Sequence, residues 1–409
     1  MIRPMRRAGA WLLQPCLVLL WLVVATGCAN TTPPKVQTTS TVPPTPTIPA
    51  PNLTPLALKT AWGTPTVRKV QNTIDANYQL YVETAHTPDG RFMLVNIGPR
   101  SLTNAQQLPT FVGLYDFNTG TMAHIHQIPG SQGQILSSGG DDRYFVWVEI
   151  TDQNFSKWTM WSYNLQTQQV QQIGQNATDA QGQSNLGIYP TPWVSNGHAV
   201  WGQRLKPQVG TDVSNDVVKL IDLSSGQTQT LATSAGLPAL SWPWVEYTHG
   251  DGKGNATGIF QNLESNQTIQ WHDDNLINLQ SIAIRGHSFV YSLLAGSSSV
   301  KYMADFTLNT TAITLVSIGG RTGDFVEFVS LSDRLIAWNS SPQLPSQVWD
   351  RKLNRLVTLP SEAYFGSMVY SSFVSWTTHD VSDDQANVLK RQGMLAPVTF
   401  NFIDTTTLP

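Results

Sequence analysis

Ile221-Asp222-Leu223-Ser224-Ser225-Gly226 is the stretch of this sequence that decides its fold, because it recurs. A short strand runs into a tight turn that is rich in Asp, Asn, Ser, Thr and Gly. Such a strand-to-turn pattern is typical of β-hairpins, since short polar side chains hydrogen-bond to the backbone of the turn. The element occurs seven times, at 115–120, 163–167, 221–226, 261–266, 306–310, 349–354 and 403–406.

A second element alternates strictly with the first and consists of an aromatic or aliphatic strand. Its seven copies are Phe92–Val95, Phe145–Val148, Ala199–Trp201, Trp244–Tyr247, Phe289–Tyr291, Leu335–Trp338 and Phe373–Trp376. The mean period of roughly 45 to 50 residues is that of a propeller blade with four strands. Thr, Ser, Gln, Asn and Gly dominate the polar residues and aromatic residues make up 10% of the chain, a composition that disfavours a helical solenoid. We therefore predict an all-β fold, a seven-bladed β-propeller of four-stranded antiparallel blades.

The two ends of the repeat are incomplete in complementary ways. The last unit has predicted strands at 367–370, 373–377 and 398–403 but no fourth strand before Pro409. An extended segment at 66–71 precedes the first predicted strand of the first blade, at 78–83. We expect this N-terminal strand to complete the last blade beside 398–403, because such closure protects an edge that would otherwise invite aggregation.

His86-Thr87-Pro88-Asp89-Gly90-Arg91-Phe92 resembles the Ser-Pro-Asp-Gly-Arg segment of the TolB-type, WD-repeat-like propellers of bacteria. The recurring strand followed by Asp-Leu-x-x-Gly is similar to the pattern of the same proteins. The resemblance implies a propeller fold and, by analogy of fold alone, protein-protein contacts in the cell envelope.

The N-terminal segment predicts export and a lipid anchor. Arg3, Arg6 and Arg7 precede an apolar run over 10–25, as in a signal peptide. Ala25-Thr26-Gly27-Cys28 then resembles the lipobox of bacterial lipoproteins, which implies that Cys28 is lipidated and becomes the new N-terminus. We expect the chain on the extracytoplasmic face of the cell membrane or outer membrane, held by this anchor. The alternatives are an ordinary secretory signal with a chance cysteine and an uncleaved membrane anchor.

Three segments follow from these features: a signal peptide at 1–27, a tether at 28–59 and the propeller at 60–409. The tether is rich in Thr and Pro and almost uncharged, so it buries too little surface to offset the entropy of ordering it. We expect it to be a disordered, semi-rigid spacer. The other cysteine, Cys16, lies in the signal peptide, so no disulfide is expected in the mature chain.

The charge of the chain argues against a nucleic-acid partner, because charged residues make up 12% of it and its formal net charge is -3. The sequence carries no phosphate-binding glycine loop, nucleophile elbow or zinc-binding helix motif. We therefore expect no cofactor and no metal, and assign no catalytic residue. A two-carboxylate glycan hydrolase or lyase is an alternative, because its acid and base can come from distant blades.

The long connections of the predicted blades leave from one end of the sheets, at 98–110, 205–216, 248–256, 339–347 and 378–395, with 174–186 on the same side. Loops held by a rigid scaffold commonly carry binding residues, so we place the binding face there. The candidate residues are Arg100, Trp158, Lys206, Asp212, His249, Asp251, Asn255, His379 and Asp380.

Other patterns are better explained by structure than by chemistry. The glycine-rich segment from His249 to Asn255 is interpreted as a hairpin loop rather than a calcium site. His124 and His126 are interpreted as packing or surface residues rather than zinc ligands. Trp147, Trp201, Trp338 and Trp376 occupy equivalent strand positions and are assigned to the core.

Three functions fit these observations. The first is a membrane-anchored, extracytoplasmic binding or scaffold lipoprotein whose long-loop face recognises a protein or glycan of the envelope. The second is an extracytoplasmic glycan hydrolase or lyase. The third is a purely structural component of the envelope.

Overall fold

The computed structural model describes the chain from Asn52 onward, with gaps. The described residues are 52–101, 108–129, 133–151, 157–177, 190–205, 216–251, 255–295, 297–308, 311–318, 326–340, 346–360, 368–370, 372–394 and 396–409. The predicted signal peptide, Cys28 and most of the predicted tether lie outside these residues.

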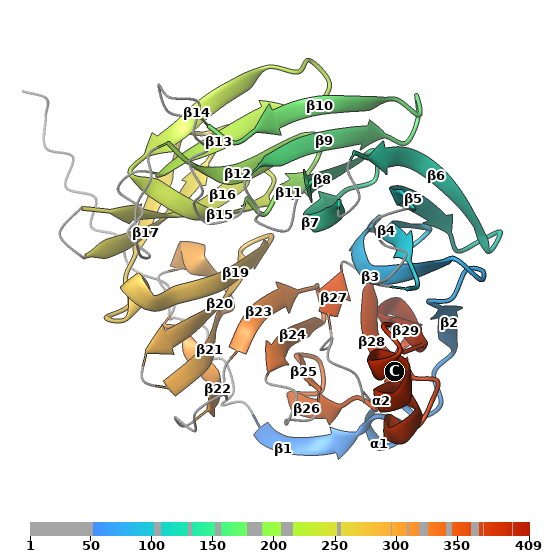
Figure 1. Ribbon diagram of the computed structural model, residues 1–409. Helices are drawn as coiled ribbons and strands as arrows, with labels where there is room; N and C mark the ends of the chain where they lie inside the picture. The colour runs from blue at the N-terminus through green and yellow to red at the C-terminus, as the bar shows by residue number, and fades with distance from the viewer. Residues whose placement is uncertain are drawn as a thin grey trace, which may run out of the picture. The chain divides into compact units, whose positions relative to one another are not determined.

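Seven antiparallel sheets stand around one axis, and the first strand of each is innermost (Figure 1). The prediction of a seven-bladed, all-β propeller is therefore confirmed. Blades 1 to 3 are formed by β3 (Tyr78–His86), β4 (Phe92–Pro99), β5 (Thr110–Asp116) and β6 (Thr121–Ile128); by β7 (Gln134–Gly140), β8 (Tyr144–Ile150), β9 (Trp158–Asn164) and β10 (Val170–Gln175); and by β11 (Trp193–Ser195), β12 (His198–Arg204), β13 (Asp216–Asp222) and β14 (Thr228–Thr233).

Blades 4 to 7 follow the same order. They are formed by β15 (Ala235–Ser241), β16 (Trp244–Gly250), β17 (Ala256–Asn262) and β18 (Thr268–Trp271); by β19 (Leu279–Arg285), β20 (Ser288–Ala295), β21 (Ser297–Met303) and β22 (Ile313–Ile318); by β23 (Val326–Leu331), β24 (Leu335–Ser340), β25 (Gln347–Asp350) and β26 (Arg355–Thr358); and by β27 (Met368–Tyr370), β28 (Phe373–His379) and β29 (Val398–Asp404). Short 3-10 turns lie at Leu276–Asn278, Phe306–Leu308 and Thr405–Thr407.

The N-terminal strand β2 (Val67–Gln71) completes blade 7, as predicted. It pairs antiparallel with β29, in a register that places Val67 opposite Ile403 and Gln71 opposite Thr399. Asn72 extends the pairing, because its N–H donates to Val398 O over 2.9 Å and its Oδ1 accepts from Val398 N over 3.0 Å. The first and last parts of the repeat thus share one sheet.

The chain just before β2 corrects our boundary between tether and propeller. β1 (Asn52–Ala57) pairs in parallel with β26 as a fifth strand of blade 6, and α1 (Leu58–Trp62) follows it. Residues 52–59 were assigned to the disordered tether, and that assignment is wrong. Their composition gave no sign of a strand because β1 takes its hydrogen-bond partners from the free edge of β26, not from an alternating pattern of its own.

A buried carboxylate secures this added segment. Trp62 Nε1 donates to Asp350 Oδ2 over 2.8 Å, and Arg334 Nη2 donates to the same oxygen over 2.7 Å. Arg334 Nη1 also donates to the carbonyl oxygen of Leu408, over 3.0 Å. One carboxylate of blade 6 is therefore linked to chain segments near both ends of the propeller.

The recurrent Asp or Asn in the sequence has the same structural role in every blade. Its Oδ1 accepts the backbone N–H two residues later over 2.8 to 3.0 Å, which forms the turn after the third strand. In blades 1 to 6 this turn leads into the fourth strand, and in blade 7 it is the 3-10 turn Thr405–Thr407. The next residue donates its N–H to a carbonyl in the turn between the first and second strands of the same blade. The seven residues are Asp116, Asn164, Asp222, Asn262, Asp305, Asp350 and Asp404.

Hydrogen bonds between neighbouring inner strands hold the blades together near these turns. The described pairs are Asp141 Oδ2 with Gly197 N, Ser195 Oγ with Trp242 N, Ser241 Oγ with Gly286 N, Arg285 Nε with Asp333 Oδ1, and Ser372 Oγ with Pro88 O. Each joins one blade to the next, so they fix the spacing of the inner strands around the axis.

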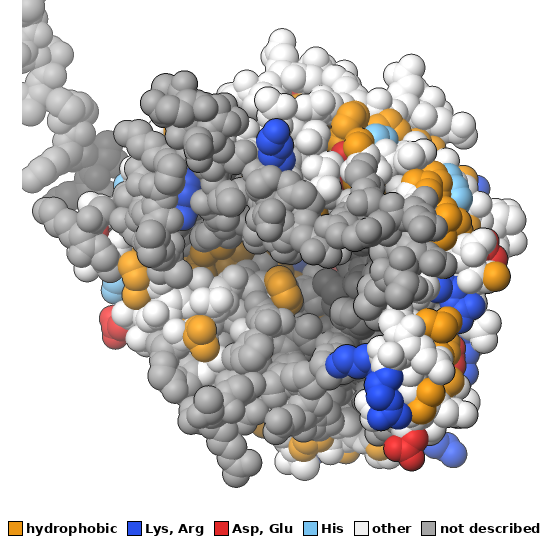
Figure 2. Space-filling model, in the orientation of Figure 1, with side chains coloured by type: hydrophobic (Ala, Val, Ile, Leu, Met, Phe, Trp, Pro, Cys, Tyr) orange, Lys and Arg blue, Asp and Glu red, His pale blue; other side chains and the backbone are white. Residues whose placement is uncertain are grey.

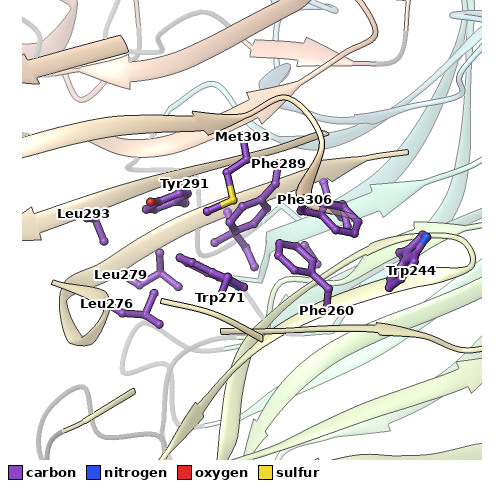
Figure 3. Close-up of a cluster of buried hydrophobic side chains, with 13 residues drawn as sticks. Trp244, Phe260, Trp271, Leu276, Leu279, Phe289, Tyr291, Leu293, Met303 and Phe306 are labelled. Atoms are coloured by element: carbon purple, nitrogen blue, oxygen red, sulfur yellow. The ribbon is translucent and has the colours of Figure 1, made fainter. Parts of the chain in front are cut away.

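Apolar side chains fill the spaces between blades. Figure 3 shows the cluster between blades 4 and 5, where Trp271 lies among Phe260, Phe289 and Tyr291. Gly258 makes room for the indole, since a Cβ built there would lie 1.9 Å from Trp271 Nε1. The four tryptophans assigned to the core are at most 4% exposed, which confirms that assignment: Trp147, Trp201, Trp338 and Trp376.

The long connections do leave from one end of the sheets, because paired residues such as Arg204 with Asp216 and His379 with Val398 stand at their roots. One connection is more ordered than we expected. The loop predicted at 378–395 contains a helix, α2 (Asp383–Arg391), with a capping box between Ser382 and Gln385. The Ser-x-x-Gln spacing is the signal that sequence reasoning missed.

Replacing Gly90 by Ala tests the seam between blades 7 and 1. Gly90 has φ +65°, and a Cβ there would lie 1.5 Å from the Phe373 ring. Gly286 occupies the corresponding turn of blade 5 at φ +56°, with nothing within 4 Å of its Cβ position. Denaturant unfolding should show Gly90→Ala to be less stable than the matched control Gly286→Ala by about 1–3 kcal/mol. Equal losses would contradict packing at this seam.

Glu246 supplies a pH test of the core. Burial raises the pKa of Glu246 well above its usual range, although the hydrogen bond from Trp271 Nε1 opposes the rise. The folded state therefore keeps a proton that the unfolded state releases, and stability falls as pH rises above the unfolded pKa of about 4.3. We expect Glu246→Gln to remove this loss, so that its advantage over the wild type grows from pH 4 to pH 8 in urea titrations.

The matched control is Glu264→Gln, because exposed Glu264 also accepts an indole N–H, from Trp242 over 2.9 Å. As an exposed residue, it should change the free energy of unfolding by less than Glu246→Gln does at pH 8. An advantage of Glu246→Gln that does not grow with pH would show that the buried carboxyl is not the cause.

Candidate binding site on the propeller axis

The inner strands surround a cavity of about 510 Å³. β3, β7, β11, β15, β19 and β23 supply most of its wall, and Gln203, Arg204 and Asp216 of blade 3 contribute at the end from which the long loops leave. At the other end the wall includes turn residues such as Asp142 and Asn196. Figure 2 looks down the propeller axis and shows apolar side chains near the centre of the view.

The strongest electrostatic contact in the wall is a buried ion pair. Arg204 Nε and Nη2 donate to Asp216 Oδ1 and Oδ2 over 2.7 and 3.0 Å, and the two side chains are 4% and 5% exposed. This two-pronged geometry is the strong form of an arginine-carboxylate pair. It holds together the roots of the 205–215 connection.

Two other titratable groups of the wall are either neutral or fully engaged in hydrogen bonds. Burial lowers the pKa of His86 to about 3, so its imidazole is neutral at physiological pH. Asp141 accepts three backbone N–H groups, from Arg143, Tyr144 and Gly197, over 2.7 to 2.8 Å. Its carboxylate thus stabilises the turn of blade 2 and links this turn to blade 3.

Arg285 is paired as well, with a residue just outside the cavity. Its Nε and Nη2 donate to the two carboxylate oxygens of Asp333, each over 2.9 Å. The hydrogen bond raises the pKa of Arg285 and lowers the pKa of Asp333. The side chains are 35% and 73% exposed, so this pair is much wetter than the pair of blade 3.

Aromatic side chains give the cavity apolar surfaces. Trp193 begins β11 and packs against the core clusters between blades 3 and 4, 4 and 5, and 5 and 6. Phe328 lies on β23 and is 58% exposed although it lines the cavity. The pairing of β23 with β24 shifts register between Val326 and Val329, which is the kind of bulge that redirects a side chain.

The inner strand of blade 4 is distorted at the same cavity. Leu237 has φ +51°, a left-handed conformation that a branched side chain rarely adopts. It lies where the pairing of β15 with β16 shifts register between Gly236 and Ala239. Such strain persists only when the surroundings enforce it, and it often marks functional sites.

Our predicted site residues lie elsewhere. None of the seven that the structure describes lines this cavity. Trp158 is a correction, because it is 5% exposed in the core of blade 2 and therefore cannot offer a binding surface. It begins β9 rather than a loop, and its alternation with Met160 on that strand could have shown this. Lys206 and Asp212 lie outside the described residues.

The other predicted residues form two separate groups. Asn255 closes a hairpin by donating its Nδ2 to Asp251 Oδ2 over 2.7 Å, beside exposed His249, so the hairpin interpretation accounts for this loop. Asp380 Oδ1 accepts from Thr399 Oγ1 over 2.6 Å, next to half-buried His379 at the end of β28.

Arg100 belongs near the second group. Its Nη1 donates to Asp75 O over 3.3 Å, and the next residue, Ser101, forms a β-bridge with Met394. The bridge joins the long connections of blades 1 and 7. None of these residues lines the axial cavity.

Sequence reasoning missed the cavity because it looked for reactive groups on loops. Small and polar residues of inner strands form part of the wall, most clearly Ser137-Ser138-Gly139-Gly140 in β7. The scarcity of large apolar residues in this one strand was the available signal.

Within the described residues, no three His, Cys, Asp or Glu side chains are grouped as a metal site would require. The same residues include no helix of the length and hydrophobicity needed to cross a membrane.

Comparisons with known proteins found solved structures of low sequence identity. No model of a protein family matches the sequence, and no curated protein matches it. An oligogalacturonate lyase in complex with manganese is 12% identical, with TM-score 0.49 over 88% of this chain and 98% of that chain. A chain of the mitotic checkpoint complex is 11% identical, with TM-score 0.47 over 94% and 99%.

TolB from Acinetobacter baumannii is 14% identical, with TM-score 0.37 over 58% of this chain and 55% of that chain. The matched part thus spans about half the length of TolB.

Replacing Asp216 by Asn tests the buried ion pair. The substitution leaves the Arg204 charge buried without a carboxylate, which should reduce the free energy of unfolding by about 3 kcal/mol. Asp333→Asn is the matched control, because it removes the same two-pronged geometry from an exposed site and should cost under about 1 kcal/mol. Similar losses for both variants in urea unfolding would contradict the assigned burial.

Proposed function

We propose that this chain is a lipid-anchored, extracytoplasmic binding protein of the bacterial envelope, and that its propeller recognises a protein or glycan without catalysing a reaction. Three features of the sequence support this localisation: Arg3, the apolar run at 10–25 and the lipobox-like segment ending at Cys28. The cavity supports the binding function, because its volume lies within the range of about 300–1,000 Å³ that is usual for ligand sites.

The pairing of charges in the cavity is the observation that carries the proposal. A hydrolase of the two-carboxylate kind needs one carboxyl to give a proton and another to act as base or nucleophile. Here Asp216 is held by Arg204, and Asp141 is occupied by three N–H groups. Groups so engaged fix the shape of a site, which favours binding over acid-base catalysis.

The architecture also suits an anchored binding module. The added strand β1 and the hydrogen bonds of Trp62 and Arg334 to Asp350 attach the chain that follows the tether firmly to blade 6. β1 lies at the outer edge of the blade 6 sheet, whereas inner strands line the axial cavity.

Replacing Cys28 by Ser tests the anchor. A bacterial host fed an alkyne-tagged fatty acid should label the wild-type chain and bring it into the detergent phase on phase separation. Cys28→Ser should lose the label and move to the aqueous phase, because a thiol is the attachment point. Cys16→Ser is the matched control and should behave as the wild type, since Cys16 lies in the segment that is removed. An undiminished label on Cys28→Ser would disprove the anchor.

A further inference from the structure

We infer that the axial cavity binds a neutral oligosaccharide, with one sugar ring stacked on Phe328. This inference rests on the proposed binding function and names the ligand class of the same site. Three properties of the wall lead to it, namely its charge, its aromatic surfaces and its hydrogen-bonding groups.

The charge of the wall selects against ionic ligands. Arg204 is paired with Asp216, Arg285 with Asp333, and His86 is neutral. Among the described lining residues, Asp141 and Asp142 are the charged side chains without an ion pair. Asp141 is engaged by three backbone N–H groups, and Asp142 lies in an exposed turn at one end. An anionic sugar or a peptide terminus would therefore lose its hydration without gaining an opposite charge.

The aromatic surfaces suit the apolar face of a sugar ring. Phe328 is large, apolar and 58% exposed. It lies on the inner strand β23, at the point where the pairing with β24 shifts register. Trp193 forms a second, rigid surface, because it packs against the cores of three blade interfaces. A large exposed apolar side chain inside a cavity favours a ligand that covers it.

The polar groups of the wall are hydroxyls and amides that both donate and accept hydrogen bonds, as sugar hydroxyls do. Ser138 Oγ is buried and, within the described structure, has no hydrogen-bond partner. Gln280 presents an exposed amide from β19. Neutral polar groups beside an aromatic ring match a neutral saccharide better than a charged or wholly apolar ligand.

Calorimetric titration of the full chain, purified in a polyoxyethylene detergent that carries no sugar, tests this inference. The probes are maltotriose, cellotriose and triacetylchitotriose, with trigalacturonate as the anionic trisaccharide of similar size. We expect at least one neutral trisaccharide to bind, and trigalacturonate to bind more weakly. Stacking on an aromatic ring predicts that Phe328→Ala weakens binding by about 3- to 10-fold.

Two variants control for folding and location. Phe328→Trp keeps an aromatic surface and should retain binding, whereas Leu308→Ala removes an exposed apolar side chain outside the cavity and should have no effect. Saturation-transfer NMR on the same samples should show the sugar ring protons, not the reducing end alone, in contact with the protein.

The inference is overturned if no neutral trisaccharide binds at millimolar concentration, if trigalacturonate binds most tightly, or if Phe328→Ala binds as the wild type does. Those results would leave the lipid anchor standing, because fatty-acid labelling of Cys28 reports on it independently. If the wild-type chain binds sugar but takes up no fatty-acid label, only the proposed localisation is refuted.

Discussion

The pairing of β2 with β29 is the constraint on which the remaining structure depends, because a propeller buries its sheet faces only if the ring is closed. Val67 to Gln71 supply the fourth strand that blade 7 lacks, and Asn72 continues the contact with Val398. The seam is then filled by Phe373 against Gly90. Once closed, the ring holds its inner strands at fixed spacing, and the axial cavity is the space that they leave.

Closure also determines the electrostatics of the site. Inner strands meet their neighbours through hydrogen bonds such as Asp141 with Gly197 and Ser241 with Gly286, so polar groups near the axis are engaged by the scaffold itself. A charged group in such a place is costly unless it is paired. The pairing of Arg204 with Asp216 therefore neutralises both of these charges, and the carboxylates of Asp141 and Asp142 are the unpaired charges of the described wall, which disfavours an anionic ligand.

Much of the fold was predictable because the repeat has a local physical cause. Each Asp or Asn of the recurring motif bonds to its own turn, and the next N–H bonds to a second turn of the same blade. Both contacts use residues within one repeat, so they leave a periodic trace in the sequence. β1 leaves no such trace, because its partner β26 lies some three hundred residues away and supplies the hydrogen bonds.

The sequence by itself determined the number of blades, the strand that closes the ring and the tryptophans of the core, since periodicity and burial of apolar residues are written in neighbouring positions. The tertiary structure alone decided where a ligand would bind. Trp193, Phe328 and Ser138 come from three blades and become neighbours of one cavity only when the ring curls. Trp158, chosen from its place near a loop, is buried instead, because the direction of a side chain depends on register and on the adjacent blade.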